Sequence, residues 1–352
     1  MEFGLSQDQI LLQDSVKKFL ATEAPLDLVR GIAAKEQTDA AVWQGLIDLG
    51  IAGLLIPEAQ GGVGLGMLDA VVVAEALGYA ICPGPYLSSA VMAARYLTDA
   101  GASELLPGIA AGTTRVGVAF AAATGARSDT NIEATGTTLS GSSLFALDAD
   151  ADGYLVATKD KRVYYVETSA LARRALTTID CTRTICELTF DQSAASLISD
   201  DASVLDSALY AGRAIQAADT LGASQCMLDQ AVSYSLDRKQ FNRAIGSFQA
   251  VKHMCAEMVS QLEPCRAFVW FAGHAFDDAP DEAGLTACHA KAHLAEVGQF
   301  VAKTSTEVHG GMGFTDLVGL HYWFKRVGFN RQLLGSPEAV REEAANLQAL
   351  CA

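Results

Sequence analysis

Hydrophobic positions recur at helical spacing in both outer parts of the chain and give way to strand-like alternation between them. Ser6 and Gln9 form a capping box before an apolar stripe, which predicts an amphipathic helix. Further helices are predicted at residues 43–55 and from Met67 onward. The last part holds long apolar segments with short joints, which is typical of a helix bundle. These segments run over residues 205–236, 248–276, 283–308 and 317–350.

The middle of the chain predicts a small β domain. Near Thr113 the sequence becomes rich in valine, tyrosine and threonine, in short runs separated by glycine, aspartate and serine. The runs lie at residues 115–123, 152–158, 162–168 and 185–191. We therefore expect a mainly α fold with a small antiparallel β domain in the middle. The expected domains are residues 1–114, 115–198 and 199–352.

Two loops carry candidate binding chemistry. Arg238 stands beside the aromatic Phe241 in a short loop between two predicted helices, where a guanidinium can hold a phosphate through two hydrogen bonds. The alternative for this loop is a solvated charged turn. About sixty residues later, EVHGGMGF (residues 307–314) has three glycines in four positions. Without side chains in the way, another group can approach that backbone closely.

Composition narrows the classes of function. The net charge is −16 and no long Lys/Arg cluster occurs, so we expect no nucleic acid and no membrane as partner. The 8 cysteines include no CxxC pair and indicate reduced thiols of a cytoplasmic protein rather than disulfides or a zinc site. His289 and His293 lack the glutamate of an HExxH motif, so no metal site is expected. Neither a signal peptide nor a bilayer-spanning apolar run is recognisable.

The motifs RKQF, FQAVKH and HGGMGF, with the loop IPEAQGG near the N-terminus, together resemble the acyl-CoA dehydrogenase family. The resemblance implies an N-terminal helical domain, a middle β domain and a C-terminal four-helix bundle. It also implies FAD bound between two subunits, with the arginine loop from one and the glycine turn from its neighbour. The FAD-binding residues implied are Arg238, Phe241, Phe248, Gln249, Glu307, Gly310 and Gly311, and Arg213 is the implied substrate-binding residue.

Three departures from the family pattern bear on flavin binding. The family's Thr-Glu-x-x-x-Gly-Ser-Asp stretch is reduced to residues 121–129 here, and only Phe145 is available where a tryptophan commonly covers the flavin. Glu307 stands where a neutral glutamine is usual, and its carboxylate would oppose a nearby pyrophosphate. His309, beside the glycine turn, either contacts flavin or is a buried histidine with its hydrogen bonds satisfied.

The family's catalytic carboxylate has no counterpart at either position that carries it. One position, before Gly335, holds Leu334, and the other, before Arg213, holds Gly212. Neither side chain can accept the α proton, so we assign no catalytic residue in this chain. The acids nearest to these positions are Glu338 and Asp206, each of which is either a base with shifted geometry or a solvated surface residue.

The lost glutamate and the altered β domain resemble a subunit of the bacterial heteromeric dehydrogenases that act on CoA thioesters of steroid side chains. The implied function is FAD-dependent α,β-desaturation of an acyl-CoA, with the base supplied by a related subunit and electron-transfer flavoprotein as acceptor. The partner is a related subunit or a second copy, in a dimer or tetramer. A non-catalytic scaffold subunit and a flavin monooxygenase are the alternatives. A further hypothesis is that Gly212 widens the acyl cavity for a bulky ring system.

Overall fold

The computed structural model describes residues 4–124 and 131–350 and confirms the mainly α fold with a β domain in the middle. The predicted capping box is present, because Gln9 N donates to Ser6 Oγ (3.2 Å) and Ser6 N donates to Gln9 Oε1 (2.9 Å). The N-terminal elements are α1 (Gln7–Glu23), α2 (Leu26–Ala33), α3 (Ala40–Asp48), η1 (Glu58–Gln60), α4 (Met67–Tyr79), η2 (Tyr86–Ala93), α5 (Ala94–Asp99), η3 (Ser103–Leu105) and α6 (Leu106–Ala110).

The helix predicted over residues 43–55 is wrong in its bounds. It begins earlier, at Ala40, and ends at Asp48, because Gly50 adopts a left-handed backbone (φ +80) that no longer helix would accommodate. The start near Met67 is confirmed, since α4 begins there, with its first amide hydrogen-bonded to Asp277 Oδ2 of a distant helix (2.8 Å).

The middle of the chain forms one 8-stranded sheet in the order β6-β7-β3-β1-β4-β5-β8, with β2 paired to β3. The expectation of a purely antiparallel sheet is wrong, because β1 pairs with β4 in parallel. This follows from β1 lying between β3 and β4, so that the chain reverses after β3 and returns along the far side of β1. The strands are β1 (Val116–Ala119), β2 (Ile132–Thr135), β3 (Thr138–Leu147), β4 (Gly153–Ala157), β5 (Val163–Glu167), β6 (Ala172–Leu176), β7 (Ile185–Ala194) and β8 (Ser196–Ser199), with η4 (Thr168–Ala170) before β6.

The C-terminal part is helical, and its last predicted segment, residues 317–350, is divided in two. The helices are α7 (Ala202–Asp237), α8 (Gln249–Asp278), α9 (Pro280–His309), α10 (Leu320–Gln332) and α11 (Pro337–Leu347), with η5 (Ile245–Ser247) and η6 (Gly310–Phe314) at the joints. The break between α10 and α11 lies at Leu334 and Gly335, whose φ angles of +60 and +113 cannot belong to a right-handed helix.

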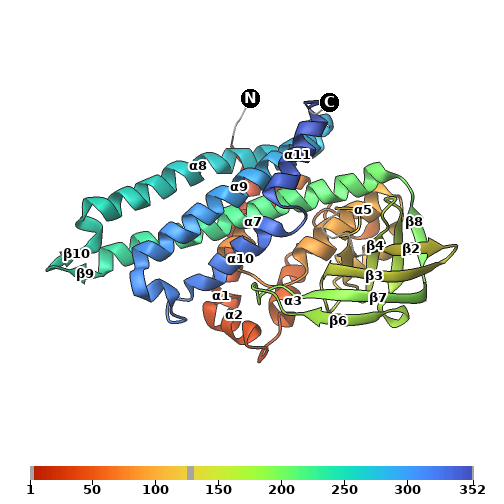
Figure 1. Ribbon diagram of the computed structural model, residues 1–352, viewed down its shortest axis with the longest axis horizontal. Helices are drawn as coiled ribbons and strands as arrows, with labels where there is room; N and C mark the ends of the chain where they lie inside the picture. Colours follow the sequence, from red (N-terminus) through yellow and green to blue (C-terminus); the bar gives the residue numbers. More distant parts are fainter. Residues whose placement is uncertain (1–3, 125–130, 351–352) are drawn as a thin grey trace.

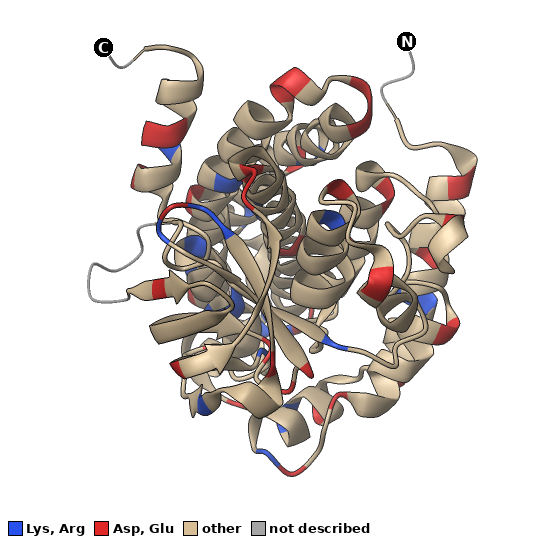
Figure 2. Cartoon of the chain, turned by 90° about the vertical axis from the view of Figure 1, so that its right-hand side faces the viewer, with Lys and Arg blue, Asp and Glu red and all other residues tan. Residues whose placement is uncertain are grey.

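The three longest helices, α7, α8 and α9, run along the long axis of the molecule (Figure 1). A small hairpin of β9 (Lys239–Gln240) and β10 (Arg243–Ala244) lies at one end of this axis, and the β sheet lies at the other. Viewed from the sheet end, acidic and basic segments are interspersed (Figure 2). Among the described helices, none combines the length and apolar character required to cross a bilayer.

Candidate functional site

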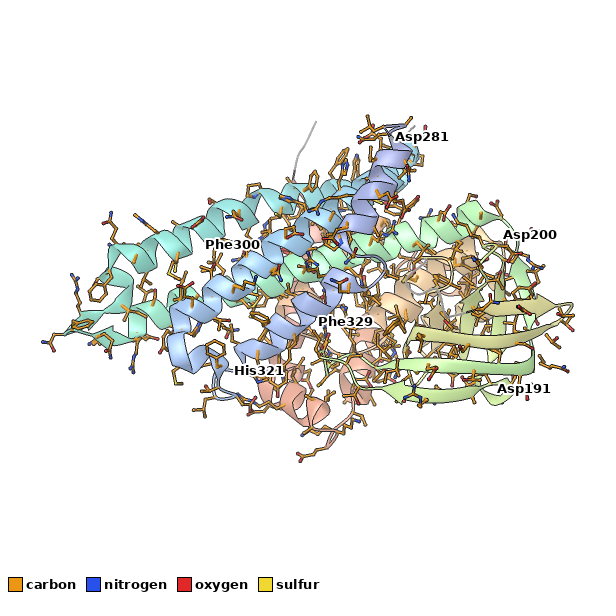
Figure 3. All side chains as sticks on the ribbon, viewed as in Figure 1. Asp191, Asp200, Asp281, Phe300, His321 and Phe329 are labelled. Atoms are coloured by element: carbon orange, nitrogen blue, oxygen red, sulfur yellow. The ribbon has the colours of Figure 1, made fainter. Side chains whose placement is uncertain are left out.

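A cleft of about 520 Å³ lies between the β sheet and the helices α10 and α11. On α10, Phe329 lies between the helix bundle and the sheet (Figure 3). We refer to this space as the cleft. Its walls are mostly apolar, and none of the described residues that line it is Asp, Glu or His. The lining residues are Val118, Phe120, Ala121, Thr124, Phe145, Leu147, Thr178, Ile179, Gly328, Phe329, Gln332, Leu333, Leu334, Gly335, Ser336 and Ala339.

The two positions where the family carries its base contact each other, and one of them, Leu334, lines the cleft. A Cβ placed on Gly212 would lie 2.7 Å from Leu334 Cδ1 and 2.8 Å from Met92 Sδ, so these two side chains fill the space that Gly212 leaves. The hypothesis that Gly212 widens the acyl cavity is therefore wrong. Met92, on η2, had no sequence signal that pointed to this role.

Arg213 is buried behind this point, and its polar contacts are with the protein. Its Nε donates to the Leu334 carbonyl oxygen (3.1 Å), and its Nη1 donates to Cys288 Sγ (3.3 Å). An ion pair with Glu343 (2.7 Å) holds the guanidinium in place. With 3% of its surface exposed, Arg213 fixes the break between α10 and α11. Its predicted contact with substrate stays a prediction.

The two acids nearest to the vacant base positions are ion-paired away from the cleft. Asp206 accepts two bonds from Lys161 Nζ (2.7 and 2.9 Å). Glu338 lies at the exposed start of α11, 3.5 Å from Arg331. Its own backbone amide and the Ser336 hydroxyl hold the pKa of Glu338 below the usual range, which makes it a weak base. Both contacts favour the surface-residue interpretation.

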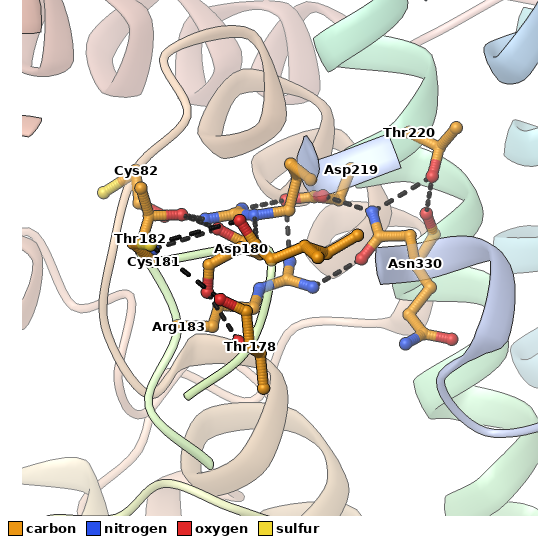
Figure 4. A network of polar contacts seen from close by, with 12 residues as sticks. Cys82, Thr178, Asp180, Cys181, Thr182, Arg183, Asp219, Thr220 and Asn330 are labelled. Atoms are coloured by element: carbon orange, nitrogen blue, oxygen red, sulfur yellow. Dashed lines mark hydrogen bonds and ion pairs between the residues drawn. The ribbon is translucent and has the colours of Figure 1, made fainter. Parts of the chain in front are cut away.

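A buried polar network fixes the loop that forms one wall of the cleft (Figure 4). Arg326, on α10, is fully buried and pairs with Asp180 (2.5 Å) of the β6–β7 loop and with Asp219 (3.0 Å) of α7. Arg183 of the same loop also pairs with Asp219 (2.9 Å). Burial alone would raise the pKa of Asp180, but Arg326 and Arg183 outweigh it and hold that pKa below its usual range. The sequence offered no signal for this network, because its members are separated along the chain.

The predicted arginine loop lies at the opposite end of α7 and is exposed to solvent. Arg238 caps α7, and among the described residues no ion pair involves it. Phe241 is 86% exposed, and its ring meets Phe248 edge-on, with 6.0 Å between ring centroids. Arg243 lies over the Phe248 ring (3.9 Å), a cation that the sequence analysis did not single out. Gln249, also exposed, begins α8.

The glycine turn is open to solvent as predicted from its composition. Nothing lies within 4 Å of a Cβ placed on Gly310 or Gly311, and Gly310 has a positive φ of +59. Glu307, one turn earlier on α9, is exposed on the same end of the helix. His309 is buried, and its Nδ1 donates to the Ser305 carbonyl oxygen (2.8 Å), so the structure agrees with the satisfied-histidine interpretation.

The arginine loop and the glycine turn lie side by side in one chain. The Tyr234 ring, near the end of α7, stacks on the His309 ring at the end of α9, with 4.7 Å between centroids. A single protomer therefore presents both segments, and they need not come from two subunits to meet. We call residues 238–249 together with residues 307–314 the clamp. The hairpin of the clamp lies at one end of the long axis, and the β sheet, which forms one wall of the cleft, lies at the other (Figure 1).

Comparison with protein families identifies both helical parts of the chain. Residues 6–113 match the family described as Acyl-CoA dehydrogenase, N-terminal domain, and residues 202–347 match Acyl-CoA dehydrogenase, C-terminal domain. The chain belongs to the acyl-CoA dehydrogenase family. Acyl-CoA dehydrogenase IpdE2 of Mycolicibacterium smegmatis is 30% identical over 347 residues, which cover 98% of this chain and 99% of that relative.

Chains of two solved structures have the same fold over nearly their whole length. The ChsE4-ChsE5 complex from Mycobacterium tuberculosis gives a TM-score of 0.89 at 26% identity, covering 100% of both chains. A variant of the Tcur3481-Tcur3483 steroid ACAD gives 0.87 at 27% identity, covering 98% of each chain. The predicted resemblance to heteromeric dehydrogenases is thus confirmed.

Members of this family are flavoproteins that use FAD, and the residues of this chain fit such a group in most respects. The clamp offers an exposed guanidinium, an exposed ring and open glycine backbone, which suit a pyrophosphate and an adenine. The cleft offers apolar walls and aromatic rings, which suit a flat ring system. Glu307 is the one clamp residue whose charge opposes a phosphate. Of the altered stretch 121–129, residues 125–129 lie outside the described part of the chain.

Proposed function

We propose that this chain is one subunit of an FAD-dependent acyl-CoA dehydrogenase that desaturates an acyl-CoA thioester between the α and β carbons. The observation that carries the proposal is an exposed clamp at one end of the molecule together with a cleft that has no Asp, Glu or His among its described lining residues. FAD, when bound, accepts the hydride that leaves the β carbon. Binding of FAD and of the substrate, and removal of the α proton, depend on side chains of this chain or of its partner.

The clamp of this chain would hold the adenine and pyrophosphate part of FAD. Arg238 and the open amides of the glycine turn would hold the pyrophosphate. Phe241 would contact the adenine, since its ring is exposed and is supported by Phe248. The residues predicted to bind FAD would therefore all belong to one surface of this chain.

The base comes from the partner chain. In this chain Leu334 occupies one base position and Gly212 the other, and neither side chain can accept a proton. A base must come within hydrogen-bond reach of the α proton, about 2.6–3.2 Å. The partner is therefore a related dehydrogenase subunit that keeps its glutamate, and a steroid-derived CoA ester is the proposed substrate, with electron-transfer flavoprotein as acceptor.

The test is co-expression with a related dehydrogenase subunit, followed by flavin counting for each chain. We expect a yellow complex that desaturates a steroid CoA ester faster than a linear one. Replacing Arg238 by Ala removes charge-assisted bonds and should weaken FAD binding by about 10- to 100-fold. Arg174→Ala, which breaks an ion pair with Glu187 on the sheet, is the matched control and should bind FAD normally.

A scaffold subunit is the second candidate, because the filled base position also suits a chain that only stabilises its partner. The two candidates differ at Arg238. If the complex with Arg238→Ala keeps its full flavin content and activity, the clamp is not used and the scaffold interpretation stands. A colourless complex of the unaltered chains in the presence of added FAD would exclude the dehydrogenase proposal.

A further inference from the structure

The stacked pair of Tyr234 and His309 occupies the junction between the two halves of the clamp. Tyr234 lies one helical turn before Arg238, and His309 directly precedes Gly310. The two rings are 4.7 Å apart between centroids and are inclined by 28°. The pair therefore connects the end of α7, from which the arginine loop departs, with the end of α9, from which the glycine turn departs.

His309 is locked beneath the glycine turn. Only 3% of its surface is exposed, and its Nδ1 donates to the Ser305 carbonyl oxygen (2.8 Å). Gly313 packs directly on it, since a Cβ at Gly313 would lie 3.1 Å from His309 Cβ and 2.9 Å from the Thr306 carbonyl oxygen. The Cβ of His309 thus packs under the glycine turn, while the bond to Ser305 fixes the orientation of its ring toward Tyr234.

Tyr234 is connected to the arginine loop as His309 is connected to the glycine turn. Its carbonyl oxygen accepts from Arg238 N (2.9 Å), and the Arg238 carbonyl oxygen in turn accepts from Ile245 N (2.8 Å), which closes the loop. A shift of Tyr234 therefore moves the backbone that carries the guanidinium. Because the two rings are in contact, a movement of the arginine loop would also move the glycine turn.

We propose that Tyr234 and His309 are positioning residues for FAD: their stack sets the spacing between the arginine loop and the glycine turn so that both contact one pyrophosphate. The inference rests on the proposed function and names the residues that pre-organise its binding surface. A pre-organised site binds more tightly because less ordering of the loops is required when the ligand arrives. Both residues would act through the backbone of the two clamp segments rather than through a contact with FAD.

The same geometry makes the clamp sensitive to acid. Burial lowers the pKa of His309, partly offset by its bond to the Ser305 carbonyl, so the ring is neutral at neutral pH. The groups that face it are Tyr234 from α7, Ser305 and Thr306 from α9, and Gly313 from η6, all of them uncharged. A proton added to the buried ring has no counter-ion there and disfavours the stacked arrangement.

The test measures FAD affinity of the complex with its partner by flavin fluorescence, from pH 5 to pH 8. Tyr234→Ala and His309→Ala should each weaken binding by about two- to tenfold, the range for one aromatic pair. The double variant should be no worse than either single one, because the rings act as a unit. Tyr234→Phe and His309→Phe keep the stack and should bind like the unaltered chain at pH 8.

The pH profile separates positioning from general stability. The unaltered complex should lose affinity as the pH falls, whereas His309→Phe, which cannot be protonated, should lose less. The control is His274→Ala, which replaces an exposed histidine paired with Asp278 on α8. This variant should change neither the FAD affinity at pH 8 nor its dependence on pH. Normal affinity in both alanine variants, with normal melting temperatures, would overturn the inference. Absence of FAD binding by the unaltered complex would instead overturn the proposed function.

Discussion

Lys291 shows how one buried side chain can make stability depend on pH. It is 3% exposed on α9, and its Nζ donates to the Asn330 carbonyl oxygen at the end of α10. Burial, together with Arg213, Arg183 and Arg331, lowers the pKa of Lys291 to about 7. The unfolded chain keeps the proton up to about pH 10.4, so between these values the unfolded state binds more protons than the folded state.

Stability should therefore rise as the pH increases above 7. The free energy of unfolding of the unaltered chain, minus that of Lys291→Met, should increase between pH 7.5 and pH 9 by up to about 1.4 kcal/mol per pH unit. Urea unfolding at several pH values measures this difference. Lys303→Met, an exposed lysine on the same helix, should give a flat difference. A flat profile for Lys291→Met as well would mean that Lys291 is charged in the folded protein.

At the level of elements, two helices cross with their backbones in contact. A Cβ on Gly78 of α4 would lie 2.1 Å from the Asp219 carbonyl oxygen, and one on Gly222 of α7 would lie 1.9 Å from the Glu75 carbonyl oxygen. Backbone atoms cannot yield as flexible side chains do, so both positions exclude any side chain. This crossing holds Asp219 where it pairs with Arg326 and Arg183, and thus supports the wall of the cleft.

Replacing Gly222 by Ala should push α4 and α7 apart. We expect a loss of about 3 kcal/mol in the free energy of unfolding, at the upper end of the range for overpacked cores. Gly328→Ala on α10 is the matched control, because a Cβ there meets only Ile179 Cδ1 at an ordinary 3.5 Å. Its higher helix propensity should stabilise the chain by up to about 1 kcal/mol. Equal melting curves for the two variants would contradict the close crossing.

The molecule as a whole carries its binding features at two ends. The clamp end exposes large apolar side chains together with basic residues, on a chain whose net charge is −16. Phe241, Phe314 and Leu317 are each at least 80% exposed at this end. Apolar groups of this size, gathered beside an open glycine turn, are typical of a surface that another chain covers. The proposed function assigns that role to the partner subunit.

Phe241→Asp should therefore prevent assembly and leave the fold intact. The variant should lose the partner and its flavin on size-exclusion chromatography, because an exposed aromatic anchor contributes about 2 kcal/mol or more to such interfaces. Its own thermal stability should change by no more than about 0.5 kcal/mol. Leu197→Asp on β8, where the leucine is 51% exposed, is the control. A stable flavin-containing pair with Phe241→Asp would show that the partner binds elsewhere.

The sequence alone determined the features that depend on local pattern. Helical spacing located the long helices, the capping box at Ser6 and Gln9 was correct in both bonds, and the motifs around Arg238 and Gly310 indicated the family. Strands such as β3 and β6 were missed, because β3 is rich in serine and β6 is an exposed edge strand without alternation.

Only the tertiary structure decided which side chains from distant parts of the chain contact each other. The filling of the space over Gly212 by Leu334 and Met92, the network around Arg326 and the stack of Tyr234 on His309 join residues far apart in the chain. Periodicity reports which face of an element is buried but not which side chain it meets, since that depends on how the elements pack. The break between α10 and α11 belongs to the same class, because Leu334 adopts its positive φ where Arg213 holds its carbonyl.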